Sequence, residues 1–300
     1  MRKPFIFFTF LLLIPHMSFA AAGDILFRCT FEESGSTPAD VVRNCGGNPG
    51  TMNNSSTLVT DGYNGRRALR YYYPNTGGEV IDLFSTPRLN KQEITVDYWE
   101  KFDVDPASSG IWNVKSIRPY VGSGSNDYMA AIMSLHNGAQ FYQSSWGGTG
   151  TLTTTSEVAS VSTSSGYCLG SGTSYTCPSG RMELRWKPSW GTTWHNIRIY
   201  IKVPSNNTSA DGQTTVWIDG KQIYSLTNLA RSSLWSSTWV PYTTHINFHP
   251  SDDFFQGISG TRFSFHHFYD DITVYEGYIP PTNNGIATTP TLSAPTYSLN

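Results

Sequence analysis

The stretch His195-Asn196-Ile197-Arg198-Ile199-Tyr200-Ile201-Lys202-Val203 decides the fold class. Its isoleucines occupy every second position, which is the period of a β-strand with one buried face. Further along the chain, Thr215-Val216-Trp217-Ile218 runs into the turn dipeptide Asp219-Gly220, and Lys221-Gln222-Ile223-Tyr224 follows. Two apolar runs joined by Asp-Gly predict a β-hairpin.

The same period continues away from this stretch, while helix signals are nearly absent. Residues 94–102 alternate in the same way, and clusters of Gly, Asn, Ser and Pro separate the candidate strands. We expect further strands at 25–31, 68–73, 111–120, 128–135, 139–145, 244–249 and 262–275. Many short strands without helices predict an all-β protein, a two-sheet antiparallel jelly-roll sandwich.

One segment interrupts this pattern. Residues 144–180 are rich in Ser, Thr and Gly and contain two cysteines. Long loops inside a compact domain are often functional. A surface loop closed by a disulfide is the alternative interpretation.

The first residues predict export. Arg2 and Lys3 are followed by an apolar run at 5–14 and by Ser18-Phe19-Ala20. A charged start, a short apolar run and small residues at the cleavage site are typical of a secretory signal peptide. The run is shorter than the roughly 20 apolar residues of a membrane span. We therefore expect an extracellular or periplasmic protein whose mature chain does not span a membrane.

The last residues differ in composition from the rest. From Pro280 the chain consists mostly of Pro, Thr, Asn, Ser and Ala, without an apolar period. Such a composition is typical of a tail or linker. The predicted organisation is a signal peptide at 1–22, a jelly-roll domain at 23–279 and a tail at 280–300.

The four cysteines fit an exported protein. They allow three pairings, of which we expect the two local ones, Cys29–Cys45 and Cys168–Cys177. A zinc site is the competing interpretation. It is disfavoured because the spacings do not form a Cys-x-x-Cys pair and because export favours oxidation.

The composition narrows the range of functions that the chain can have. Charged residues make up only 14% of the chain and the net charge is −2, so a nucleic-acid partner is not expected. Aromatic residues also make up 14%, which is high enough to suggest that some of them face solvent and bind sugar rings. The chain lacks a P-loop, a dinucleotide fingerprint, a Gly-x-Ser-x-Gly elbow and a His-Glu-x-x-His stretch. We expect no organic cofactor.

A series of short motifs carries a family resemblance. In chain order they are Phe31-Glu32, Trp194-His195, Asp211-Gly212, Val216-Trp217-Ile218-Asp219-Gly220-Lys221 and Phe268-Tyr269-Asp270-Asp271-Ile272-Thr273-Val274. The series resembles concanavalin A-like jelly-roll proteins, in particular secreted polysaccharide lyases of the heparin-lyase and alginate-lyase type. It covers about residues 25–279. Lectin-like and laminin-G-like modules share this frame, so the resemblance implies the fold more directly than the chemistry.

The resemblance implies β-elimination rather than hydrolysis. The glucanases of this superfamily use a Glu-x-Asp-x-Glu strand, which this chain lacks, and retaining hydrolysis needs two close carboxyl groups. A lyase needs a group that neutralises the uronate carboxylate, a base and an acid. The candidates are Arg118 or Arg185 for the carboxylate, His136 or His249 as base, and Tyr142 or Tyr269 as acid.

Two strands place polar side chains in a row. Arg181-Met182-Glu183-Leu184-Arg185 resembles the Arg-x-Glu-x-Arg strand of alginate lyases, and its three charged residues share one face. The accompanying Gln-x-His strand of those enzymes has no counterpart here. In a second row, His245, Asn247 and His249 alternate with Ile246 and Phe248, which we expect to face the core. A solvated outer face is the alternative for this row.

Cations and aromatics complete the expected substrate contacts. Trp112, Lys115 and Arg118 lie on one predicted strand, where Lys115 and Arg118 fall on opposite faces if the strand is regular. A cation in the groove would bind an acidic sugar, although ordinary surface charges are the alternative. The expected substrate-binding residues are Trp112, Lys115, Trp146, Glu183, His245 and Asn247.

Three carboxylates suggest a structural metal. Glu32 lies at the start of the mature chain, and Asp270 and Asp271 lie near its end. First and last strands often lie side by side in this fold, so these residues are candidates to hold Ca²⁺ through oxygen ligands. Solvent-exposed carboxylates are the competing interpretation.

The sequence leaves three functions open. The first is a lyase that acts on an acidic, uronate-containing polysaccharide. The second is a non-catalytic carbohydrate-binding module that uses Trp112, Trp146 and Trp217. The third is a structural or adhesion protein.

Overall fold

The computed structural model describes most of the predicted domain. The described residues are 23–50, 52, 55–73, 83–104, 114–122, 131–135, 141–144, 149–163, 168–178, 181–188, 190–231, 239–248 and 264–281. The predicted signal peptide and residues 282–300 of the predicted tail lie outside them. No helix among the described residues is long and apolar enough to cross a membrane.

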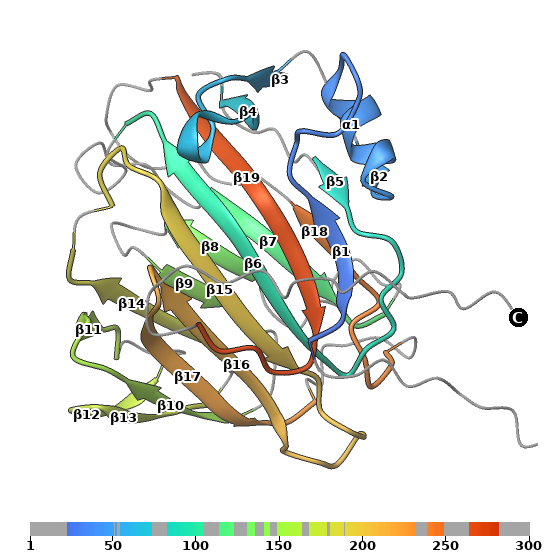
Figure 1. The fold of residues 1–300 in the computed structure, drawn as a ribbon. Coiled ribbons are helices and arrows are strands. Elements are labelled where there is room, and N and C mark those ends of the chain that lie inside the picture. The colour runs from blue at the N-terminus through green and yellow to red at the C-terminus, as the bar shows by residue number, and fades with distance from the viewer. Residues whose placement is uncertain are drawn as a thin grey trace, which may run out of the picture.

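Within the described residues, the larger sheet is antiparallel and has eleven strands. In spatial order they are β12 (Leu169–Ser171), β13 (Ser174–Cys177), β10 (Gly150–Thr154), β17 (Lys221–Leu229), β16 (Gly212–Ile218), β15 (His195–Lys202), β6 (Glu93–Phe102), β19 (Phe265–Glu276), β4 (Ala68–Tyr73) and β3 (Ser56–Val59), and β1 (Ile25–Cys29) also pairs with β19. Figure 1 shows β15, β6 and β19 side by side across this sheet.

The second sheet is also antiparallel and has eight strands in the part of the chain that the structure describes. Their order is β11 (Val158–Val161), β14 (Arg181–Trp186), β9 (Phe141–Ser144), β8 (Ala131–Leu135), β7 (Val114–Tyr120), β18 (His245–Phe248), β5 (Phe84–Ser85) and β2 (Asn48–Pro49). In Figure 1 it lies behind the larger sheet. The all-β sandwich predicted from the sequence is confirmed.

The core lies between the sheets because each sheet buries one set of alternating residues. Ile197, Ile199 and Ile201 of β15 are fully buried, as the strand period predicted. The ring of Tyr98 on β6 packs edge-on against Phe248 of β18, with ring centroids 6.1 Å apart. Aromatic rings therefore fill much of the space between the sheets, which accounts for part of the high aromatic content.

The predicted hairpin forms at Asp219 and Gly220. Both residues have positive φ, 50° and 78°, as a two-residue type I′ turn requires. Strands β16 and β17 run antiparallel on either side of this turn.

The Ser/Thr/Gly-rich segment differs from the loop that its composition suggested. It contains β10, β12 and β13, which extend the larger sheet, and β11, which pairs with β14 in the smaller sheet. Cys168 and Cys177 form a disulfide across the β12–β13 hairpin. Hydroxyl-bearing side chains suit exposed strands, but they leave no apolar period in the sequence.

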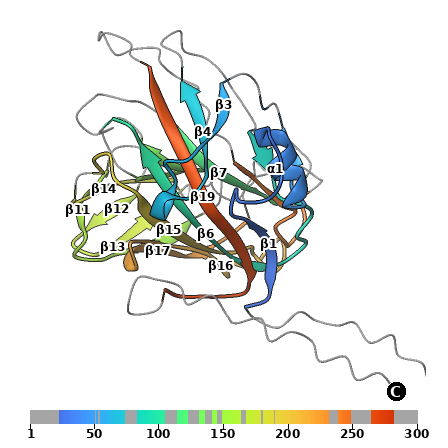
Figure 2. The same ribbon diagram turned by 45° about the horizontal axis from the view of Figure 1, so that its top comes forward.

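A short helix, α1 (Pro38–Asn44), was not expected. The Thr37 hydroxyl accepts a hydrogen bond from the Asp40 amide at 3.2 Å, and Pro38 occupies the first turn. Cys45 directly follows the helix and forms a disulfide with Cys29 of β1, so both predicted disulfides are confirmed. Figure 2 shows α1 beside β1 at one edge of the sandwich.

Candidate functional site

The outer face of the eight-stranded sheet brings together residues from two distant parts of the chain. Strands β7 and β18 pair so that Arg118 lies opposite Asn247 and Tyr120 lies opposite His245. Ile246 is fully buried on the core side, so its neighbours in β18 point to the outer face. Arg118 is half-buried and Asn247 is 8% exposed. The sequence predicted Arg118, His245 and Asn247 as site residues, and the fold makes them neighbours.

The imidazole of His245 is held in one orientation. Its ring stacks on Tyr120, with centroids 4.7 Å apart and an interplanar angle of 6°. The Thr244 hydroxyl donates to the Tyr120 carbonyl at 3.1 Å, and the same oxygen lies 3.0 Å from Nδ1 of His245. Because this hydroxyl gives its only hydrogen to the carbonyl, it accepts from Nδ1–H. In the neutral ring the basic lone pair is then on Nε2.

Strand β14 places a second charged row on the same outer face. Met182 and Leu184 are buried in the core, whereas Glu183 is half-buried and Arg185 is exposed, as the alternation predicted. Tyr142 of β9 is the register partner of Glu183. Strands β9 and β8 separate β14 from β7, a distance of about 14 Å at the usual strand spacing. The β14 row and the Arg118–Asn247 pair are therefore separate groups.

Strand β7 is not regular. The register with β8 shifts between Lys115 and Ile117, and both Ser116 and Ile117 are fully buried. An extra residue in one strand is a β-bulge, which interrupts the alternation of faces. The expectation that Lys115 and Arg118 fall on opposite faces assumed a regular strand, and that condition is not met here.

Two predicted residues lie in the interior. Tyr269 is fully buried between the sheets, and its hydroxyl donates to the Ser116 carbonyl at 3.2 Å. Burial raises its pKa well above the ordinary value. Its side chain has no contact with solvent, so it cannot donate a proton to a substrate bound on the outer face. Trp217 is only 4% exposed, which contradicts its predicted role as an exposed sugar-binding ring.

Other predictions fall outside the described part of the chain. These are Trp112, His136, Trp146 and His249. For Lys115 and Tyr142 the structure describes the backbone only.

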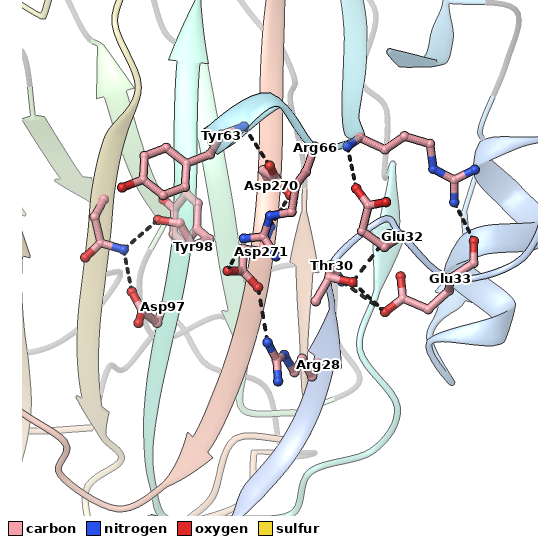
Figure 3. A network of polar contacts seen from close by, with 12 residues as sticks. Arg28, Thr30, Glu32, Glu33, Tyr63, Arg66, Asp97, Tyr98, Asp270 and Asp271 are labelled. Atoms are coloured by element: carbon pink, nitrogen blue, oxygen red, sulfur yellow. Dashed lines mark hydrogen bonds and ion pairs between the residues drawn. The ribbon is translucent and has the colours of Figure 1, made fainter. Parts of the chain in front are cut away.

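The carboxylates predicted to bind calcium accept hydrogen bonds from the protein (Figure 3). The Arg67 amide donates to Glu32, and the Tyr63 amide donates to Asp270 at 2.8 Å. Asp271 pairs with Arg66 at 2.9 Å, as Figure 3 shows. These donors occupy oxygens that a metal would need.

Burial also affects the protonation of this cluster. It raises the pKa of Asp270 to about 7, although the Tyr63 amide opposes the shift.

Among the described residues, the one close group of three potential metal ligands is Cys29, Glu33 and Cys45, and its two cysteines form a disulfide. Calcium at Glu32, Asp270 and Asp271 stays a prediction.

Sequence reasoning missed Tyr120 and Thr244 as partners of His245. Both fell within or beside predicted strands, so their strand positions were available from the period. The pairing of β7 with β18 joins residues more than a hundred positions apart, and local patterns do not encode that register.

Comparison with known proteins supports the fold. No protein-family model and no curated protein sequence matches the chain. The marine PL-14 alginate lyase from Aplysia kurodai superposes with a TM-score of 0.51 at 13% identity, covering 84% of this chain and 98% of that one. The endo-β-1,4-glucuronan lyase from the fungus Trichoderma reesei gives a TM-score of 0.43 at 16% identity, with coverage of 77% and 91%. The first likeness shows that the chain has a jelly-roll fold like that of a polysaccharide lyase.

Proposed function

We propose that this chain is a secreted polysaccharide lyase that cleaves a uronate-containing polysaccharide by β-elimination. The observation that carries the proposal is the Arg118–Asn247 pair beside the Tyr120–His245 pair on the outer face of the eight-stranded sheet. The lyase-like fold is consistent with it. The two disulfides support an oxidising compartment and hence secretion.

The charge of this sheet favours an acidic substrate. Its eight strands, as described, contain Lys115, Arg118, Arg181 and Arg185 but a single acidic residue, Glu183. The whole chain has a net charge of −2, whereas the described strands of this sheet have an excess of positive charge. A cationic surface attracts an anionic polymer and opposes the binding of a cationic one.

The scarcity of carboxylates in the described strands of this sheet also argues against hydrolysis. Glycosidases that work with two carboxyl groups hold them within about 10 Å of each other, on either side of the scissile bond. Glu183 is the one carboxylate in the described strands of this sheet. Elimination needs no such pair.

The residues present can perform each step of an elimination. Arg118 and Asn247 donate hydrogen bonds to the uronate carboxylate and stabilise the charge that develops there. Nε2 of His245 removes the C5 proton, and the C4–O bond breaks as the C4=C5 double bond forms. A tyrosine protonates the departing oxygen. We assign this step to Tyr120, whose ring stacks on His245, with Tyr142 as the alternative.

One assay tests the proposal. The purified chain is incubated separately with alginate, glucuronan, heparin and pectate, and two signals are followed: ultraviolet absorbance of the unsaturated uronate and release of reducing ends. A rise in both signals on one polymer supports elimination. Reducing ends without the absorbance would indicate hydrolysis instead. Retention on a polymer column with neither signal would indicate a carbohydrate-binding module, and no interaction at all would favour a structural protein.

A further inference from the structure

A pocket of about 400 Å³ opens at the end of β7 and β18, next to the proposed catalytic residues. Its lining includes Arg88, Asn90, Tyr242, Thr244 and His245. The volume falls within the range of pockets that hold small ligands, roughly 300–1,000 Å³. His245 belongs both to this pocket and to the proposed site.

Backbone hydrogen bonds fix the walls of the pocket. The Leu89 amide donates to the Thr244 carbonyl at 2.8 Å, and the Thr244 amide donates to the Tyr120 carbonyl at 2.7 Å. On the other side, the Val240 amide donates to the Val121 carbonyl at 2.8 Å. Three segments of the chain are thus joined into one rim. A preformed site loses less entropy on binding than a site that must be ordered.

The lining favours an anion. Among the described residues, the lining includes Arg88 and His245 and contains no Asp or Glu. Arg88 is exposed and forms no ion pair with any described residue. A guanidinium presents parallel N–H donors that match the two oxygens of a carboxylate. Asn90 and Tyr242 add groups that hydrogen-bond to hydroxyls.

The position of the pocket fits a polymer rather than a free small acid. His245 lies two residues before Asn247 in β18, and its partner Tyr120 lies two residues after Arg118 in β7. Two residues of an extended strand span about 7 Å. The pocket therefore begins one row of residues beyond the Arg118–Asn247 pair. A substrate of several units can occupy both places at once, whereas a single small acid cannot.

We propose that this pocket is a second uronate subsite, in which Arg88 binds the carboxylate of a sugar unit adjacent to the one that reacts. The inference rests on the proposed function, which identifies the sugar unit that reacts. Binding of a carboxylate by Arg88 can nevertheless be tested separately from the reaction. Arg88 would bind the substrate equally in the ground state and in the transition state. Its loss is then expected to raise KM and to leave kcat nearly unchanged.

The test uses the full chain and defined oligosaccharides. Binding of an alginate or glucuronan tetrasaccharide is measured by calorimetry for the wild type, Arg88→Gln, Arg88→Lys and Arg43→Gln. Arg43 is a matched control because it is an exposed arginine on α1. We expect Arg88→Gln to raise the Kd about tenfold, as loss of a charge-assisted hydrogen bond predicts, and Arg88→Lys to have a smaller effect. Arg43→Gln is expected to bind like the wild type.

A carboxyl-reduced tetrasaccharide separates charge from shape. The wild type and Arg88→Gln are expected to bind it equally, because it lacks the group that Arg88 recognises. If Arg88→Gln binds the acidic tetrasaccharide as tightly as the wild type, or if the wild type does not bind it, the subsite inference is overturned. A wild type without lyase activity whose binding still depends on Arg88 would refute the proposed chemistry and support the subsite.

Discussion

Nε2 of His267 lies 2.5 Å from Oε1 of Glu100, and neither side chain is exposed to solvent. The Ser116 hydroxyl donates to the same carboxylate oxygen at 2.5 Å. Glu100 and His267 belong to the eleven-stranded sheet, whereas Ser116 is the bulge residue of β7 in the other sheet. This polar cluster therefore joins the two sheets directly beneath the strand that carries Arg118.

Removal of one partner of the Glu100–His267 pair should lower the free energy of unfolding. In Glu100→Ala, His267 and Ser116 keep their buried polar atoms but lose the carboxylate, and we expect the free energy of unfolding to fall by about 3–5 kcal/mol. The double variant Glu100→Leu/His267→Phe should recover much of that loss, because it leaves no buried charge. Urea denaturation measures both effects. A loss below about 1 kcal/mol for Glu100→Ala would contradict the idea that this contact holds the sheets together.

The second prediction concerns the proposed catalytic pair. Arg118→Gln removes the charge that stabilises the developing enediolate, so we expect kcat/KM on the susceptible polymer to fall by a factor of about 100 or more. Steady-state absorbance measurements check this value, with Arg43→Gln as the control and thermal melting to confirm folding. Full activity in Arg118→Gln would remove this residue from the mechanism.

The third prediction concerns a histidine outside the site. Burial disfavours the charged form of His195, but its hydrogen bonds to Asp219 at 2.8 Å and to the Trp190 carbonyl at 2.8 Å outweigh burial and raise its pKa. The native state then holds this proton to a higher pH than the unfolded state does. The stabilisation is therefore complete below about pH 6.5 and is lost as the pH rises through the native pKa.

Asp219→Asn keeps the turn geometry, because asparagine also adopts the positive φ of this position. We expect it to reduce the free energy of unfolding by about 1 kcal/mol at pH 6 and by less at pH 9. Urea denaturation at both pH values measures the difference, and an NMR titration of His195 reports the pKa itself. An equal loss at both pH values would mean that the ion pair contributes nothing to the pH dependence.

The fourth prediction is the calcium site at Glu32, Asp270 and Asp271. Ca²⁺ takes about six to eight oxygen ligands, and here it would have to displace Arg66 from Asp271. If the ion binds, the melting temperature should fall with a chelator and recover with Ca²⁺, and Asp270→Asn should abolish this response. A melting temperature that is unaffected by chelator and by Ca²⁺ would refute the site and leave the carboxylates as partners of the arginines and amides.

The sequence predicted those parts of the fold whose signal is local. The period-two pattern placed a strand at 68–73, where β4 lies, and another at 195–203, where β15 ends one residue earlier at Lys202. It also predicted the hairpin turn, because the Asp-Gly dipeptide readily adopts the positive φ that Asp219 and Gly220 have. Each of these features depends on a few consecutive side chains.

Parts that depend on distant contacts could not be predicted. The bulge at Ser116 is held by Glu100, a residue of the other sheet, so nothing near Ser116 in the sequence indicates it. The same holds for the meeting of Arg118 with Asn247, because strand register is fixed only when both strands are in place. The individual candidate residues could therefore be predicted from the sequence, whereas their grouping in space could not.

The two disulfides also determine how the chain can be produced. Cys29 and Cys45 are 16 residues apart, and Cys168 and Cys177 are 9 apart. The entropic cost of closing a loop rises with its length, so in a reduced, unfolded chain these partners meet more often than cysteines from opposite ends. Oxidative refolding from denaturant should reach the native pairing with little reshuffling, so that each variant can also be recovered from insoluble material.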